Sequence, residues 1–205
     1  MNISKKIKND KIILQQKVDN FNRKIIHILS AVIIIFFPYF FSLQQIIMIS
    51  LFFSFLFALA RIFAMFKIFN LFKIINKVNR ISWGEIFYPL GVMLSAIFFL
   101  PDRVLSFQFG ILVLGLSDAL ANIFGSLFGS FRIKVFGGVK SLEGSLVFFL
   151  TTFILLLLLN GCCGGPLIFS YLLITLILTI IEFSLFFGLD NLFLPILASY
   201  LFTLI

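Results

Sequence analysis

Charged residues are scarce in this chain of 205 residues: Lys, Arg, Asp and Glu together make up 12% of the sequence, whereas 61% of the positions are hydrophobic. A soluble domain of this length needs a much larger polar surface. The composition therefore excludes a soluble globular protein and predicts one membrane domain. The net charge of +8 does not indicate nucleic-acid binding, because the chain has no room for the folded soluble surface that such binding needs.

Cysteine is also nearly absent, and this limits the chemistry that the chain can perform. Cys162 and Cys163 are adjacent in a Gly-rich loop, so they provide neither a disulfide framework nor a metal cluster. Residues 1–24 are too long and too charged for the start of a signal peptide, and no small-residue cleavage site follows the first apolar run. We expect them to form a retained, basic cytoplasmic extension.

Long apolar runs are abundant, and each is a candidate transmembrane helix. The fold class predicted is an all-α, polytopic membrane helix bundle, with residues 25–205 as a single transmembrane catalytic domain. About seven spans are expected, at 25–41, 43–60, 86–100, 104–124, 145–159, 167–188 and 192–205. The third, fifth and seventh are short for a bilayer crossing.

The positions of Lys and Arg predict the orientation, because short cytoplasmic loops retain positive charge. Basic residues precede the first span and fill the loops at about 61–85 and 125–144, while the intervening loops carry only Arg103. The N-terminus is therefore predicted to be cytoplasmic. Residues 71–80 have the pattern of an interfacial helix. We expect a multi-pass protein, placed in the inner membrane if the chain is bacterial, with its active site facing the cytoplasm.

Two carboxylates lie inside the predicted spans, where a charge costs about 2.5 to 3.5 kcal/mol and needs a partner or a function. Asp118 and Glu182 are each about 9 Å from the cytoplasmic end of their span, given the helical rise. Asp118, Asn122, Gly125 and Gly129 share one stripe of a helix. The stripe also has a simpler interpretation, since two glycines four residues apart are a helix-packing motif in membranes.

The loop before the fifth span has the residue types that bind phosphate. Glycines allow backbone N–H groups to approach phosphate oxygens, and Lys140 supplies positive charge. Ser141 can cap a helix whose N-terminus favours anions, and Gly144 lies in the first turn. Glu143 is available for metal or proton chemistry. The alternative is that Lys140 is ordinary cytoplasmic positive charge.

Five further polar residues lie at the same predicted membrane face, and each has a simpler alternative. His27 can hydrogen-bond within the bundle, and Glu85 can belong to an interfacial anchor beside Trp83. The pair Asp190 and Asn191 can cap the last helix. The full set of these additional candidates is Arg23, His27, Glu85, Asp190 and Asn191.

Two segments of the chain resemble a known family. Residues 118–129 read DALANIFGSLFG and residues 140–145 read KSLEGS. Together they resemble the nucleotide-binding signature of the CTP-dependent polyprenol and lipid-alcohol kinases, which include dolichol kinase, phytol kinase and the yeast-type diacylglycerol kinase. Residues 23–27, 84–90 and 182–195 extend the resemblance over most of the chain after Asn20.

The resemblance implies a kinase that transfers the γ-phosphate of CTP to the hydroxyl of a long-chain lipid alcohol, with CTP as co-substrate and Mg²⁺ or another divalent cation as cofactor. Asp118 and Glu143 would hold the metal, since carboxylates and a lysine suffice for phosphoryl transfer. The nucleotide-binding residues would be Asn122, Gly125, Gly129, Lys140, Ser141 and Gly144. A carboxylate among Glu85, Glu182 and Asp190 would orient or deprotonate the lipid hydroxyl. The expected partners are the lipid alcohol, CTP and the bilayer.

The sequence departs from the family pattern at Ser117, where a glycine commonly precedes the aspartate, and at Val139, where a second basic residue often precedes the Lys-Ser/Thr pair. Two other functions remain as alternatives. A phosphatidate cytidylyltransferase-like enzyme would transfer CMP to a lipid phosphate, although its longer aspartate-rich signature is not found here. A transporter or membrane scaffold would use Asp118 and Glu182 for an ion path, although no inverted repeat supports it.

Overall fold

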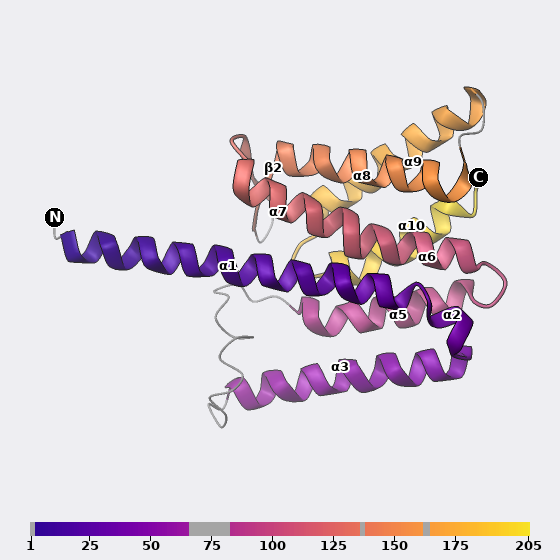
Figure 1. The fold of residues 1–205 in the computed structure, drawn as a ribbon, viewed down its shortest axis with the longest axis horizontal. Helices are drawn as coiled ribbons and strands as arrows, with labels where there is room; N and C mark the ends of the chain where they lie inside the picture. The colour runs from indigo at the N-terminus through magenta and orange to yellow at the C-terminus, as the bar shows by residue number, and fades with distance from the viewer. Residues whose placement is uncertain (1–2, 66–82, 136–137, 162–164) are drawn as a thin grey trace.

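The computed structural model describes residues 3–65, 83–135, 138–161 and 165–205, and its helices form a bundle with a small β-hairpin at one end (Figure 1). The order along the chain is α1 (Ile3–Ile34), α2 (Phe37–Phe40), α3 (Leu43–Met65), α5 (Gly84–Phe99), α6 (Val104–Leu112), η2 (Val113–Ser117), α7 (Asp118–Phe128), β1 (Arg132–Val135), β2 (Gly138–Ser141), α8 (Leu142–Asn160), α9 (Gly165–Ser184) and α10 (Asp190–Phe202).

Several of these helices are long and apolar enough to cross a membrane, which confirms the predicted helical membrane bundle. Five segments meet the length and hydropathy required: Asn20–Phe40, Leu43–Phe63, Val104–Phe128, Leu142–Asn160 and Leu167–Ser184. The expected third and seventh spans correspond to the shorter apolar helices Gly84–Phe99 and Asp190–Phe202. The count of seven crossings and their orientation stay predictions.

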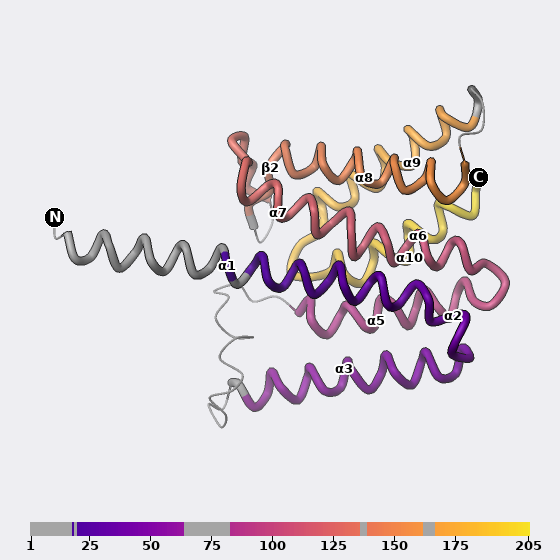
Figure 2. Tube along the Cα trace, in the orientation of Figure 1, coloured from indigo at the N-terminus to yellow at the C-terminus, as the bar shows by residue number. Residues whose placement is uncertain are grey.

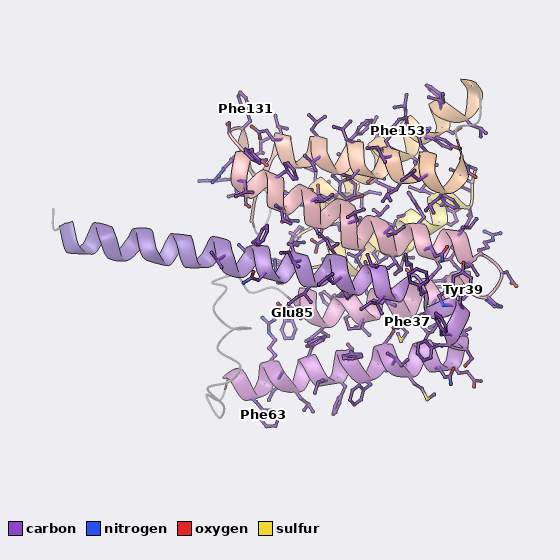
Figure 3. All side chains as sticks on the ribbon, viewed as in Figure 1. Phe37, Tyr39, Phe63, Glu85, Phe131 and Phe153 are labelled. Atoms are coloured by element: carbon purple, nitrogen blue, oxygen red, sulfur yellow. The ribbon has the colours of Figure 1, made fainter. Side chains whose placement is uncertain are left out.

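The continuous segment α6–η2–α7 is the centre of the bundle. In its apolar window 44% of the residues are buried, compared with 17 to 28% in the other four long segments. Phe107, Phe109 and Ile111 of α6 and Val113 of η2 are fully buried. Large apolar side chains on the outer helices are exposed instead, as lipid-facing residues must be, and Phe63 of α3 projects outward in Figure 3.

α3 lies at one edge of the bundle and packs on α5, while α8 and α9 form the opposite edge (Figure 2). α1 crosses between these edges and contacts η2 and α7. Close approach of α1 and η2 requires Gly115, because an added Cβ there would lie 2.0 Å from the Cβ of Ala31. α1 is also one continuous helix across the expected boundary between residues 24 and 25, so the predicted extension continues directly into the first span.

The β-hairpin was not expected, because the sequence analysis treated this segment as a loop. β1 and β2 pair antiparallel, with Ile133 opposite Lys140 and Arg132 opposite Ser141. Each strand has only four residues, and β1 alone alternates basic and apolar residues, so the pattern is too short to distinguish a strand from a loop. Three predicted features lie outside the described residues: the interfacial helix at 71–80, most of the loop at 61–85, and the cysteine pair.

Candidate functional site

The structure brings the predicted polar residues to the same end of the bundle. The hairpin and several helix ends meet there (Figure 1): the start of the apolar part of α1, the end of α3, the start of α5, the end of α7, the start of α8, the end of α9 and the start of α10. We call this region the polar end; it contains Arg23, Lys24, His27, Arg61, Glu85, Asp118, Asn122, Lys140, Glu143, Glu182, Asp190 and Asn191. The opposite end carries the exposed residues Asp102 and Arg103, between α5 and α6.

Asp118 is fully buried at the start of α7 and is paired with a lysine from α1. Its Oδ2 lies 2.5 Å from Nζ of Lys24, which is only 5% exposed, and its Oδ1 accepts a hydrogen bond of 2.8 Å from Asn122. The π-helical turn η2 ends directly before Asp118, and such turns are frequent at functional sites. The paired carboxylate is thus held in a defined position in the interior of the bundle.

Sequence reasoning missed Lys24, because it belongs to a run of basic residues that flanks the first span and looks like ordinary cytoplasmic charge. One signal was present. Lys24 and His27 are three residues apart and therefore lie on neighbouring positions of one helix face. Since that face meets Asp118, the lysine belongs with the candidate site.

A second ion pair connects the hairpin to α9. Nζ of Lys140, in β2, donates to the carboxylate Oε1 of Glu182 and also to the main-chain carbonyl of Glu182. Glu182 is only 3% exposed, and its other oxygen, Oε2, is buried without a hydrogen-bond partner. Two residues that the sequence proposed separately, one for phosphate and one for proton transfer, are therefore in direct contact.

Glu85, in the first turn of α5, receives two arginines. Its Oε1 lies 3.8 Å from Nη1 of Arg23, and its Oε2 lies 3.5 Å from Nη1 of Arg61. The guanidinium of Arg61 also lies over the ring of Trp83, 4.6 Å from its centroid. Figure 3 shows Glu85 between α1 and α3. This group ties three helices together at the membrane edge.

His27 makes an aromatic contact rather than an ion pair. Its ring lies edge-on to that of Tyr88, with 4.7 Å between the centroids, and its Nδ1 is buried without a hydrogen-bond partner. The hydroxyl of Tyr88 is 2.9 Å from that of Ser30. The hydrogen bond considered as the simpler role of His27 is therefore not made at Nδ1, and its role in the site stays a prediction.

The turn between α9 and α10 brings Asp190 and Asn191 to the start of α5. Nδ2 of Asn191 donates to the carbonyl of Gly84 at 2.8 Å, and N–H of Trp83 donates to the carbonyl of Phe187 at 3.1 Å. α10 begins without a side-chain cap, so the capping role considered for these two residues is not used. Their other oxygens, Oδ1 of Asp190 and Oδ1 of Asn191, are buried without a partner.

The glycines of the predicted nucleotide signature pack α7 against the start of α8. A Cβ added to Gly125 would lie 2.6 Å from Oγ of Ser141, and one added to Gly144 would lie 2.8 Å from the carbonyl of Ala121. Ser141 caps α8 as expected, since its Oγ accepts a bond of 3.1 Å from the N–H of Gly144. Gly129 also meets Ser141. Helix packing is therefore one role of this motif, and its role toward a nucleotide stays a prediction.

Glu143 binds the chain that leads into the hairpin. Its Oε1 accepts the backbone N–H groups of Ser130, at 2.7 Å, and Phe131, at 3.0 Å. Its Oε2 is buried without a partner. The carboxylate thus fixes the entry to β1 and keeps one oxygen unoccupied.

Both members of the predicted metal pair already accept hydrogen bonds from the protein. The oxygens of Asp118 have donors in Lys24 and Asn122, while Glu143 is bound to the hairpin entry. Within the described ranges, no group of three or more His, Cys, Asp or Glu residues is placed to hold a metal ion. The two-carboxylate metal site stays a prediction, and we derive no reaction step through it.

Comparison with known proteins gives partial matches. The chain is 34% identical over 120 residues to an uncharacterized protein of Methanocaldococcus jannaschii, which covers 58% of this chain and 56% of that protein. It is 38% identical over 78 residues to a phytol kinase of Synechocystis, which covers 38% of this chain and 34% of the kinase. The matches thus span about half and about one third of these relatives. The chain matches no protein-family model and no solved structure.

Proposed function

We propose that this protein is a membrane-embedded lipid kinase that transfers the γ-phosphate of CTP to the hydroxyl of a long-chain lipid alcohol of the polyprenol, phytol or diacylglycerol type. The partial similarity to a phytol kinase supports a kinase that acts on lipids. The observation that carries the proposal is a pair of lysine–carboxylate contacts at one end of an apolar bundle: Lys24–Asp118, which is buried, and Lys140–Glu182, which is partly buried.

The two lysines suit the needs of phosphoryl transfer, which depends on positioning and on neutralising the charge of the phosphates. A buried ammonium requires a counter-ion, and a carboxylate fills that place while no phosphate is bound. An arriving triphosphate can replace the carboxylate as the partner of Lys140. Lys140 also lies immediately before α8, whose N-terminus favours negative charge.

The divalent ion is best treated as part of the substrate. Mg²⁺ retains several waters and binds through phosphates plus one or two carboxylates, so it does not require a ligand set built by the protein alone. In the proposal it enters with CTP, and Glu143, whose Oε2 has no hydrogen-bond partner, contributes a single contact. CTP arrives from the cytoplasm at the polar end, and the lipid alcohol enters sideways from the bilayer.

The test is transfer of label from CTP to phytol, polyprenol and diacylglycerol, and to phosphatidate for the cytidylyltransferase alternative, by the purified protein in lipid nanodiscs. Label at the γ-phosphate should reach the lipid, and label at the α-phosphate should not. Lys140→Gln should lower the rate about 100-fold or more, in line with the loss of one charge-stabilising donor. Arg103→Gln, at the opposite end, serves as the matched control and should leave the rate unchanged. Transfer of α-label would instead establish a cytidylyltransferase, and no transfer of either label would refute the proposal.

A further inference from the structure

The turn between α9 and α10, taken together with the two helix ends that flank it, has hydrogen-bond acceptors that lack donors. Oε2 of Glu182, Oδ1 of Asp190 and Oδ1 of Asn191 are buried and have no hydrogen-bond partner. A buried polar atom without a partner is costly, and native structures contain few of them. Carboxylate and amide oxygens accept and cannot donate, so the group that satisfies them must bring a hydrogen.

The orientation of Asn191 supports a ligand at this place. Its residue is only 6% exposed, and its Nδ2 is committed to the carbonyl of Gly84. Since the two amide atoms lie on the same planar group, this bond fixes Oδ1 as the atom that remains available. A neighbouring oxygen of Asp190 lacks a donor in the same turn.

The backbone of the turn is itself under constraint. Phe187 has φ of 57° and Gly188 has φ of 88°, and a bulky residue with positive φ is uncommon. The N–H of Trp83 holds the carbonyl of Phe187 at 3.1 Å, which fastens the turn to α5. Such strain concentrates at functional sites, where the surrounding structure maintains it.

The charges around Asp190 place it beside both ion pairs. Asp190 interacts electrostatically with Asp118 of α7, Lys24 of α1 and Lys140 of β2, and Glu182 of α9 interacts with Asp190 in turn. Lys24 pairs with Asp118 and Lys140 pairs with Glu182, so Asp190 is the carboxylate of this group that no described cation pairs with. It is therefore the member of the group available to receive a proton.

We propose that the turn between α9 and α10 is the subsite for the hydroxyl of the acceptor lipid, and that Asp190 takes the proton of that hydroxyl. The inference depends on the proposed kinase function. The hydroxyl donates to Asp190, while Lys140 holds the phosphates beside Glu182. Asp190, which receives the proton, is a catalytic residue; Asn191, which holds the turn against α5, is a positioning residue.

The step balances without a further reactant. The hydroxyl oxygen forms a new bond to the γ-phosphorus as the bond from that phosphorus to the β–γ bridging oxygen breaks. CDP leaves with the electron pair of that bond. The hydroxyl proton passes to the carboxylate of Asp190 and from there to water at the polar end.

The test compares Asp190→Asn with Asp102→Asn, the same chemical change at an exposed position of the opposite end, in the full chain in nanodiscs. The substrate is phytol, or whichever alcohol of the lipid panel the wild type phosphorylates. Asp190→Asn should lower kcat by 100-fold or more, the typical contribution of a general base. It should also remove the rise of the wild-type rate with pH. Asp102→Asn should change neither.

Two further measurements separate this role from a structural one. The increase in Tm caused by CTP with Mg²⁺ should be the same in Asp190→Asn and in the wild type. The Tm without ligand should stay equal or rise in the variant, because the substitution removes a buried carboxylate that has no cation partner. Asp190→Glu should recover part of kcat, and its rate should again rise with pH. A loss of the CTP effect would assign the turn to the nucleotide and overturn the inference.

Failure of the inference differs from failure of the proposed function. If the wild type phosphorylates lipid and Asp190→Asn retains its rate and pH dependence, the subsite is wrong and the kinase stands. A lower Tm together with lost activity would make Asp190 structural and also overturn the inference. If the wild type phosphorylates no alcohol, the kinase itself is refuted.

Discussion

Removal of one charge from the Lys24–Asp118 pair should destabilise the bundle much more than removal of both. Asp118 is fully buried and Lys24 is 5% exposed, so neither charge can be solvated when its partner is lost. Breaking a buried pair on one side typically costs about 3 to 5 kcal/mol, whereas replacing both members by neutral residues of similar volume is often neutral. Lys24→Met and Asp118→Asn are the single changes, and their combination is the double change.

The expected loss of Tm follows from the length of the chain. For a protein of about 200 residues, 1 kcal/mol corresponds to roughly 2 to 4 °C in Tm, so each single variant should lose roughly 6 to 20 °C. The double variant should lie within about 1.5 kcal/mol of the wild type, because no charge is left buried and Asn122 can still donate to residue 118. Thermal unfolding in nanodiscs measures all three variants, with Asp102→Asn as the exposed control. A double variant whose loss of Tm equals the sum of the two single losses would refute the buried pair.

Three further predictions concern other contacts of the bundle. Gly115→Ala should destabilise the protein by about 1 to 3 kcal/mol, because the added Cβ would lie 2.0 Å from the Cβ of Ala31. Thermal unfolding measures this effect. An unchanged Tm would contradict the close approach of α1 to η2. Glu143→Gln should speed hydrogen exchange at the amides of Ser130 and Phe131, because these amides lose a charged acceptor. Amides in the middle of α8 should keep their rates. Equal exchange at Ser130 and Phe131 in the wild type and the variant would show that this acceptor does not hold the hairpin entry. Arg61→Gln should alter the fluorescence of Trp83, the single tryptophan, whereas Arg103→Gln should leave it unchanged; identical spectra would exclude the stacked arginine.

Apolar runs predicted the helices well, because in a membrane the length of an apolar run is set by the thickness to be crossed. The run expected at 43–60 is α3, Leu43–Met65, and the one expected at 86–100 is α5, Gly84–Phe99. The helix boundaries differ by a few residues, where polar residues such as Glu85 extend a helix beyond its apolar part. Glu143 likewise lies in the first turn of α8, which begins three residues before the predicted span.

The candidate site was predicted by residue type but not by pairing. Asp118 and Glu182 were recognised because charge inside a predicted span needs a reason, and Lys140 because it lies in a Gly-rich loop suited to phosphate. The partner of Asp118 was missed, since Lys24 is 94 positions away and only its spacing from His27 sets it apart from neighbouring basic residues. The contact of Lys140 with Glu182 depends on the hairpin, and the placement of a hairpin beside α9 depends on tertiary packing that no local pattern encodes.

The central claim is tested most directly by the product of the reaction. Purified protein in nanodiscs is incubated with CTP, Mg²⁺, the panel of lipid alcohols and phosphatidate, and the lipids are analysed by mass spectrometry. The account predicts a lipid that has gained one phosphate, together with an equal amount of CDP. A lipid that has gained CMP, or lipids that are unchanged while CTP stays intact, would contradict it.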